Sequence, residues 1–321
     1  MEPTMDSLKD WLPIRIWQEA EAWRVDWCWF GDRKLDQPFF RDAVDEALRL
    51  PFNQAFRRET SLAVLCEWKL PAIEPTAFVY HASRCGSTLI GQMLAQLDEA
   101  IVISEPPPLD ALLRGALDPA VRKAALRGLL AAYGQTRRGT EQKLVIKLDA
   151  WNIGELPLLR ECFPQVPWMF VYREPLEIAV SHIRRAGMHM VPDLIGRSSL
   201  DGESQDDSRE DYIAQRLGRT LELGLEHCRA LNGLPLNYRE LPGVMDGYLA
   251  DFFGLDTPQR NKALSAAGRH AKQPAQAFVA DSQDKQREAT ERLRERVEYR
   301  TRASYDALEV SRSERRSCRP A

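Results

Sequence analysis

Apolar residues in the middle of the chain form short runs of strand length, separated by longer stretches with helical spacing. The runs are AFVYH, AIVIS, LVIK, WMFVY and PLNY, at 77–81, 100–104, 144–147, 168–172 and 235–238. Because they are almost wholly apolar, they predict strands of a parallel sheet that is covered on both faces. Strands alternating with helices predict an α/β fold with right-handed crossovers.

Helical stripes lie between and beyond these runs. The first consists of Leu89, Ile90, Met93, Leu94 and Leu97, and the second of Ile213, Leu217, Leu221, Leu225 and Cys228. Each stripe is one apolar face at helical spacing. The stretch 284–316 has helix-forming composition and mixed charge, which predicts a long solvated helix that frays.

The first 70 residues differ from the rest of the chain because they hold many of its tryptophans. Five of the eight tryptophans occur at positions 11, 17, 23, 27 and 29. We expect a turn-rich segment followed by a helix at 41–50, packed on the main domain. An aromatic surface that docks a partner or substrate is the alternative. Two prolines in LPAIEP predict a boundary near residue 71, between the segment 1–70 and a domain at 71–321.

Composition excludes several classes of protein. The chain has 321 residues and a net charge of −3, which argues against broad binding to nucleic acid. No apolar run approaches the length of a membrane span, and no signal peptide is evident, so we expect a cytoplasmic protein. The six cysteines show no metal-binding spacing, which predicts reduced thiols and no metal.

The stretch FVYHASRCGSTLIGQML, at 78–94, predicts a strand, a tight loop and then a helix that begins near Ser87. Unpaired N–H groups at a helix N-terminus form a site for an oxyanion. Gly86 allows close approach of the backbone, and Arg84 adds forked donors that match tetrahedral anions. The residues expected to hold the anion are Ser83, Arg84, Cys85, Gly86, Ser87 and Thr88. The loop lacks the Gly-Lys-Ser/Thr ending of triphosphatases, which argues against Mg²⁺–ATP chemistry.

A second anion site is predicted where the run 168–172 ends. Arg173 follows this strand, and Pro175 stands where a helix can begin. Ser181 lies six residues into that helix, about 9 Å along its axis, within reach of a long arginine side chain. Arg173 and Ser181 could therefore hold one phosphate. Ligands of open α/β sheets bind at the carboxyl ends of strands, where both predicted sites lie.

These motifs resemble those of sulfotransferases. SRCGST is similar to their phosphosulfate loop, and the arginine and serine of REPLEIAVS are similar to their 3′-phosphate site. PLNYREL resembles the segment whose tyrosine, here Tyr238, contacts the nucleotide. RHAKQPAQAFVADSQDK loosely resembles a late nucleotide-covering segment that contains Lys272. The resemblance covers about 75–321 and leaves out the tryptophan-rich N-terminus.

The resemblance implies a three-layer P-loop-type α/β fold with a central, mostly parallel sheet flanked by helices. It also implies a co-substrate, 3′-phosphoadenosine 5′-phosphosulfate (PAPS), and a product, adenosine 3′,5′-bisphosphate (PAP), with no metal required. Glu105 corresponds to a base glutamate of sulfotransferases that act on tyrosine or carbohydrates. Asp149 is the alternative base, because it stands where enzymes of phenols and steroids carry histidine. Lys147 matches their lysine and, with Arg84, is expected to stabilise the departing phosphate.

Two other functions remain open on the sequence. One is a P-loop nucleotide-dependent kinase, and the other is a non-catalytic sulfotransferase-like binding module. The acceptor is a small molecule or another partner that bears a hydroxyl, and its pocket is expected to involve 186–211 and the N-terminal segment. A homodimer is possible.

Overall fold

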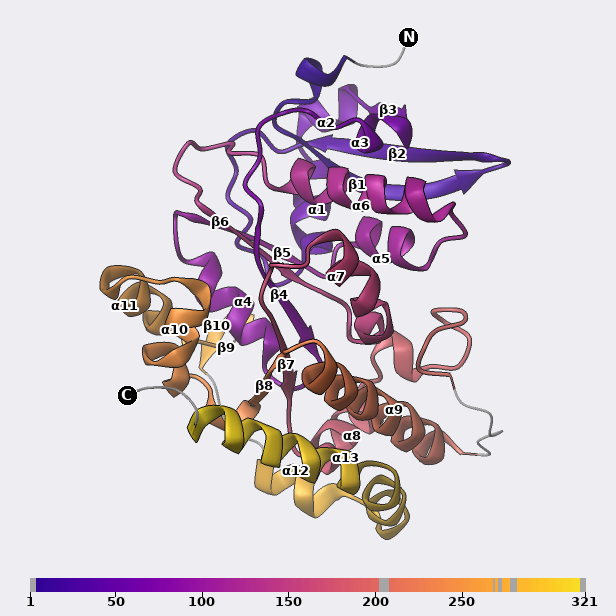
Figure 1. Cartoon of the computed structure of the whole chain (residues 1–321), viewed down its shortest axis with the longest axis vertical. Helices are drawn as coiled ribbons and strands as arrows, with labels where there is room; N and C mark the ends of the chain where they lie inside the picture. The colour runs from indigo at the N-terminus through magenta and orange to yellow at the C-terminus, as the bar shows by residue number, and fades with distance from the viewer. Residues whose placement is uncertain (1–3, 202–207, 268, 271–272, 278–281, 318–321) are drawn as a thin grey trace.

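The computed structural model describes residues 4–201, 208–267, 269–270, 273–277 and 282–317. Its centre is a five-stranded parallel sheet of order β5-β6-β4-β7-β8 (Figure 1). The strands are β4 (Pro75–His81), β5 (Ala100–Ser104), β6 (Lys143–Lys147), β7 (Trp168–Tyr172) and β8 (Leu234–Asn237). All five predicted strands are confirmed within two residues, because wholly apolar runs of this length fit a sheet that is covered on both faces.

Helices flank this sheet on both sides, so the predicted three-layer α/β architecture is confirmed (Figure 1). They are α4 (Ser87–Ala95), α5 (Pro107–Arg114), α6 (Pro119–Tyr133), α7 (Leu156–Cys162), α8 (Pro175–Arg184), α9 (Arg209–Ala230), α10 (Tyr248–Phe253) and α11 (Thr257–Ser265). The 3₁₀ turns η2 (Ala150–Glu155), η3 (Met188–Met190), η4 (Tyr238–Glu240) and η5 (Gly243–Asp246) connect them, and β9 (Arg269–His270) pairs with β10 (Gln273–Ala277). Helices α4 and α8 begin at the residues that the sequence predicts.

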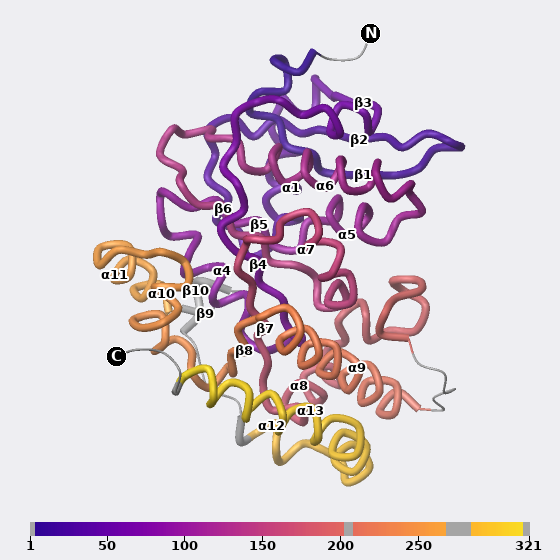
Figure 2. Tube along the Cα trace, in the orientation of Figure 1, coloured from indigo at the N-terminus to yellow at the C-terminus, as the bar shows by residue number. Residues whose placement is uncertain are grey.

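The C-terminal helices are α12 (Ser282–Glu288) and α13 (Glu291–Ser317). Helix α13 lies along α9 and α8 rather than standing in solvent (Figure 2). The prediction of a solvated helix is therefore wrong for one face. Leu293, Val297, Tyr305 and Leu308 are buried there, because they recur at helical spacing within a strongly charged sequence.

The N-terminal segment forms a small sheet of its own. It contains η1 (Met5–Leu8), β1 (Trp11–Glu19), β2 (Ala22–Trp29), β3 (Arg58–Ser61) and the helices α1 (Phe40–Leu48), α2 (Pro51–Ala55) and α3 (Ala63–Cys66). The predicted helix is confirmed as α1, but the expected turn-rich segment is wrong. Two antiparallel strands replace it, because the tryptophans pack across the pair, with Trp11 opposite Trp29.

This small sheet is held against the main domain through α6. The Tyr133 hydroxyl donates to the Pro13 carbonyl at 3.1 Å, and the Gln135 amide donates to the Trp11 carbonyl at 2.9 Å. The division of the chain at residue 71 stays a prediction. Among the residues that the structure describes, no helix has both the length and the hydrophobicity required to cross a membrane.

Candidate active site

The loop between β4 and α4 has the backbone geometry of an anion-binding nest. Ser83 and Arg84 have φ of 64° and 50°, and Gly86 has φ of 88° at the N-cap of α4. Consecutive N–H groups in such turns point toward one centre. Ser87 and Thr88 follow in the first turn and are buried. The strand, loop and helix that the sequence predicts are therefore present in this order.

Gly86 also makes room for a neighbouring ring. A Cβ atom at this position would lie 2.5 Å from Cδ2 of Tyr238, which is far inside van der Waals contact. Tyr238 comes directly after β8, two strands away from the loop in the sheet. Glycine is thus required here both by the positive φ and by the tyrosine that covers the loop.

Two side chains of the loop point toward protein groups. The Cys85 thiol donates to the Val171 carbonyl at 3.0 Å, and burial raises its pKa to about 12. Its contribution to an anion site is therefore limited to its backbone. The Arg84 guanidinium donates to the Arg185 carbonyl at 2.9 Å, and burial together with the charge of Arg185 lowers its pKa. Arg84 thus joins the loop to the end of α8.

Arg173 and Ser181 occupy the positions that the sequence predicts. Arg173 follows β7, is buried, and forms an ion pair with Glu177 on α8. The Ser181 hydroxyl donates to the Glu177 carbonyl at 2.7 Å. The Arg173 guanidinium carbon also lies 4.3 Å from the ring centre of Tyr238, a cation–π distance. Tyr238 therefore touches both predicted anion sites.

Glu105 is held at the carboxyl end of β5 by the end of β6. Its backbone has φ of 54°, and its N–H donates to the Lys147 carbonyl at 2.7 Å. Its carboxylate pairs with the buried Lys147 ammonium and lies 3.3 Å from His81 Nε2. His81 Nδ1 accepts from the Ser83 N–H at 3.0 Å, so the imidazole proton belongs on Nε2, which faces Glu105.

His81 was not predicted as a site residue. The available signal was a histidine at the last position of a strand, directly before the glycine loop. The ring of Phe39, also not predicted, lies 5.1 Å from Lys147 Nζ. No periodic pattern could identify it, because it belongs to the N-terminal segment. Lys272 lies outside the described residues.

The two candidate bases differ in charge. Burial acts to raise the pKa of Glu105, but the Lys147 ammonium and His81 outweigh burial and hold this pKa well below its usual range. Burial, and then the charges of Glu105 and Asp110, raise the pKa of Asp149 well above its usual range. Of the two carboxyl groups, Asp149 therefore binds a proton more readily, and Glu105 is the one whose ionised form is favoured. Glu105 is thus the candidate that is available to accept a proton.

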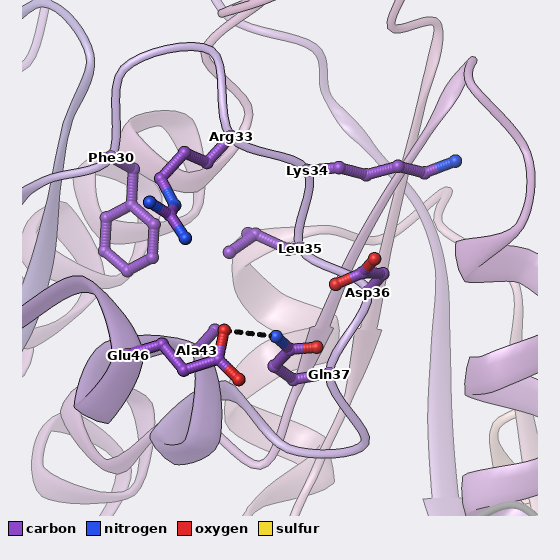
Figure 3. Close-up of a pocket in the computed structure, with 8 residues that line it drawn as sticks. All are labelled: Phe30, Arg33, Lys34, Leu35, Asp36, Gln37, Ala43 and Glu46. Carbon is purple, nitrogen blue, oxygen red and sulfur yellow. Dashed lines mark hydrogen bonds between the residues drawn. The ribbon is translucent and has the colours of Figure 1, made fainter. Parts of the chain in front are cut away.

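A cavity of about 380 Å³ lies apart from these residues, between the segment 30–37 and α1. Figure 3 shows Arg33 pointing into it beside Phe30, and the Gln37 amide donating to Glu46 at 2.5 Å. None of the predicted anion-binding or catalytic residues lines this cavity. Within the described part of the chain, no three His, Cys, Asp or Glu side chains are grouped so that they could hold a metal ion.

Comparison with solved structures finds sulfotransferases. The sulfotransferase domain of the curacin biosynthetic pathway is 17% identical, with a TM-score of 0.45 over 71% of this chain and 98% of that one. The corresponding domain of the Synechococcus PCC 7002 olefin synthase is 17% identical, with a TM-score of 0.44 over 76% and 98%. Sulfotransferase STF1 of Mycobacterium tuberculosis H37Rv is 15% identical, with a TM-score of 0.40 over 70% and 77%.

No protein-family model matches the chain, and no curated protein matches it either. At these identities and TM-scores, the likeness assigns neither a family nor an activity to the chain.

Proposed function

We propose that the protein transfers a sulfuryl group from PAPS to a hydroxyl group of an acceptor. The observation that carries this proposal is the position of Tyr238, whose ring lies against Gly86 of the loop and under the Arg173 guanidinium. Two anion sites that share an aromatic wall suit a nucleotide with phosphate groups at both ends. The adenine ring would stack near the tyrosine, and each phosphate-bearing end of the nucleotide would meet one arginine.

In this proposal, the N–H groups of 83–88 and the hydroxyls of Ser87 and Thr88 hold the 5′-phosphosulfate. Arg173 and Ser181 hold the 3′-phosphate. The acceptor oxygen forms a bond to sulfur as the bond between sulfur and the 5′-phosphate oxygen breaks, and PAP departs. The PAPS co-substrate supplies the activated sulfuryl group, and the protein supplies position and charge.

Glu105 takes the proton of the acceptor hydroxyl. Its low pKa makes it a weak base while Lys147 and His81 both face it. Negative charge that grows on the departing phosphate would attract the ammonium of Lys147, together with Arg84. As Lys147 turns toward the phosphate, the carboxylate loses its strongest partner and becomes more basic. Proton transfer and departure of the phosphate would then support one another.

Nucleotide binding tests the proposal first. Calorimetric titration should give a micromolar dissociation constant for PAP, about −8 kcal/mol of binding free energy, and much weaker binding of ATP with Mg²⁺. Arg173→Ala should weaken the binding of PAP strongly, because it removes the cation beside Tyr238. Preferred binding of ATP with Mg²⁺ would instead indicate the kinase alternative.

Transfer of labelled sulfate from PAPS tests catalysis. Arg84→Ala should lower turnover on the order of 10²- to 10³-fold, as removal of a donor to developing negative charge usually does. Unchanged turnover would remove Arg84 from the mechanism. Tight binding of PAP without transfer to any hydroxyl in a broad panel of acceptors would favour the non-catalytic binding module.

A further inference from the structure

Residues 185–197, here called the bridge segment, connect the loop after β4 with the end of α5. One end is held by the loop between β4 and α4, where Arg84 donates to the Arg185 carbonyl at 2.9 Å. The other end is held by α5, where Arg114 donates to the carbonyls of Ile195 at 2.9 Å and Arg197 at 3.0 Å. The loop follows β4 and α5 follows β5, with β6 between them in the sheet. The bridge segment therefore joins the loop after β4 to α5, and its His189 lies close enough to His81 for the charge of His81 to lower the pKa of His189.

The buried side of the bridge segment is uncharged. His189 and Met190 are buried, and the His189 ring lies 5.6 Å from the Trp151 ring and 5.4 Å from the His182 ring. Burial, and then the charges of Arg216 and His81, lower the pKa of His189 to about 3, so the ring is neutral. Its Nε2 is buried and has no hydrogen-bond partner among the residues that the structure describes. A hydroxyl group of a bound molecule could supply that partner.

The outer side of the bridge segment is apolar. Met188, Val191 and Leu194 are exposed by 43%, 37% and 58%, which is unusual for large apolar side chains that lie so close together in a chain. Between Arg185 and Arg197, the only side chain that is charged at neutral pH is Asp193. Phe39 adds an aromatic ring above Lys147 from the N-terminal segment. Exposed apolar side chains therefore belong to the same segment whose buried His189 lies near His81, the residue that faces Glu105.

We propose that the acceptor is an alcohol whose hydroxyl is carried on an apolar body, which lies along Met188, Val191 and Leu194. This inference rests on the sulfuryl transfer proposed above. A sugar or a peptide would bring many polar groups, and the exposed side chains of this surface offer a thioether and two branched alkyl groups. Burying those polar groups without partners would cost free energy, whereas burying an alkyl chain would gain it.

A series of primary alcohols of increasing chain length tests the proposal with the full chain and labelled PAPS. The value of kcat/KM should rise about two- to fourfold for each added methylene until the chain extends past the surface. Glucose and a tyrosine-containing peptide should be poor acceptors. Titration of 1-octanol into protein saturated with PAP provides a second measurement, which does not depend on turnover.

Substitutions on the bridge segment locate the effect. Leu194→Asp and Met188→Glu should flatten the dependence on chain length and weaken the binding of 1-octanol about tenfold, with binding of PAP unchanged. Val121→Asp is the matched control, because Val121 is a comparably exposed apolar side chain, at 41%, on another element, α6, and should change neither.

The outcomes separate this inference from the proposed function. Preference for sugar or peptide, or equal rates for short and long alcohols, would overturn the acceptor class while leaving sulfuryl transfer intact. A change of oligomeric mass in Leu194→Asp, with unchanged dependence on chain length, would show that a second copy covers the surface and would also overturn it. Absence of both PAP binding and transfer would remove the proposed function and this inference together.

Discussion

The pKa values of carboxyl groups shift in opposite directions at the two ends of the carboxyl edge of the central sheet. At the ends of β7 and β8, Glu309 of α13 accepts hydrogen bonds from the Tyr172 hydroxyl at 2.6 Å and the Asn237 amide at 2.9 Å. It also accepts from the Arg312 guanidinium at 2.9 Å. Burial acts to raise the pKa of Glu309, but the bonds from Arg312 and Tyr172 outweigh burial and lower it. This carboxylate is ionised and held by several partners.

Near the ends of β5 and β6, burial has the opposite result. The pKa of Asp149 is raised by burial and by the charges of Glu105 and Asp110. Burial also raises the pKa of Glu155 to about 7. One oxygen of Glu155 is buried without a hydrogen-bond partner in the described part of the chain, as is the hydroxyl of Tyr80. Burial therefore favours the neutral form of both carboxyl groups over their ionised form.

In the proposed function, these two ends would bind different molecules. Tyr172 and Asn237 directly precede Arg173 and Tyr238, so the hydrogen bonds that they donate to Glu309 fix the two strand ends that would hold the nucleotide. A fixed set of charges suits a doubly charged co-substrate, because no reorganisation is needed when it binds. An environment with neutral carboxyl groups suits an uncharged acceptor. Ionised Glu105 is the exception, which is what a proton acceptor requires.

Replacing Glu105 should have the largest effect on turnover. Glu105→Gln keeps a hydrogen-bond acceptor for Lys147 but cannot take up a proton, so turnover should fall about 10²- to 10⁴-fold. Binding of PAP, measured by calorimetry, should stay within about twofold. Asp149→Asn is the matched control, because an amide resembles the neutral carboxyl group that the raised pKa of Asp149 favours, and its turnover should change only a few-fold. A large loss in Asp149→Asn with a small loss in Glu105→Gln would reverse the assignment of the base.

Removing the carboxylate of Glu309 should have a smaller effect, and it should act on the binding of PAP. Glu309→Ala removes the acceptor that Tyr172 and Asn237 share, so Arg173 and Tyr238 should lose their fixed positions. We expect PAP to bind about tenfold more weakly, the equivalent of losing one hydrogen bond to a charged group, about 1.5 kcal/mol. The rate at saturating PAPS should change little, which separates positioning from catalysis.

The control for this experiment lies on the same helix. Glu314 is exposed on α13, so Glu314→Ala changes the same charge without touching either strand end. An equal loss of PAP affinity in both variants would show that Glu309 acts only through the overall charge. Rescue of affinity by Glu309→Gln, which can still accept hydrogen bonds, would support the positioning role.

The central sheet and the first anion loop could be predicted because their signals are local. Five apolar runs mark five strands, and a loop such as 82–86 forms between a strand end and a helix start that adjoin in sequence. The positions of Arg173 and Ser181 could be predicted for the same reason, because the strand end, Pro175 and the helix that carries Ser181 follow one another in the sequence. Parallel strands then bring such loops to one edge.

The remaining features depend on contacts between distant parts of the chain. Phe39 reaches Lys147 across more than 100 residues, and Glu309 reaches Tyr172 across 137. No periodicity in the sequence encodes such pairs. The N-terminal strands were missed because their tryptophans alternate irregularly, and cross-strand packing, visible only once the strands are paired, determines their conformation.

The smallest effect that we predict concerns stability against pH, and it compares the two ends directly. Because Glu155 holds its proton more tightly in the folded state than in the unfolded chain, its contribution is present below pH 4.5 and is lost as pH rises through about 7. The full shift would correspond to about 3 kcal/mol, which solvent screening at a partly exposed side chain reduces to roughly 1 kcal/mol.

Glu155→Gln stays neutral at every pH, so the fall in the free energy of unfolding between about pH 5 and pH 8 should become shallower by that amount, as urea denaturation would measure. Glu309→Gln should act at the other limb, because a lowered pKa contributes stability that is present above pH 4.5 and is lost as pH falls through the folded value. A slope that Glu155→Gln leaves unchanged would mean that Glu155 is ionised in the folded protein. Of the two carboxyl groups near the ends of β5 and β6, only Asp149 would then have a raised pKa.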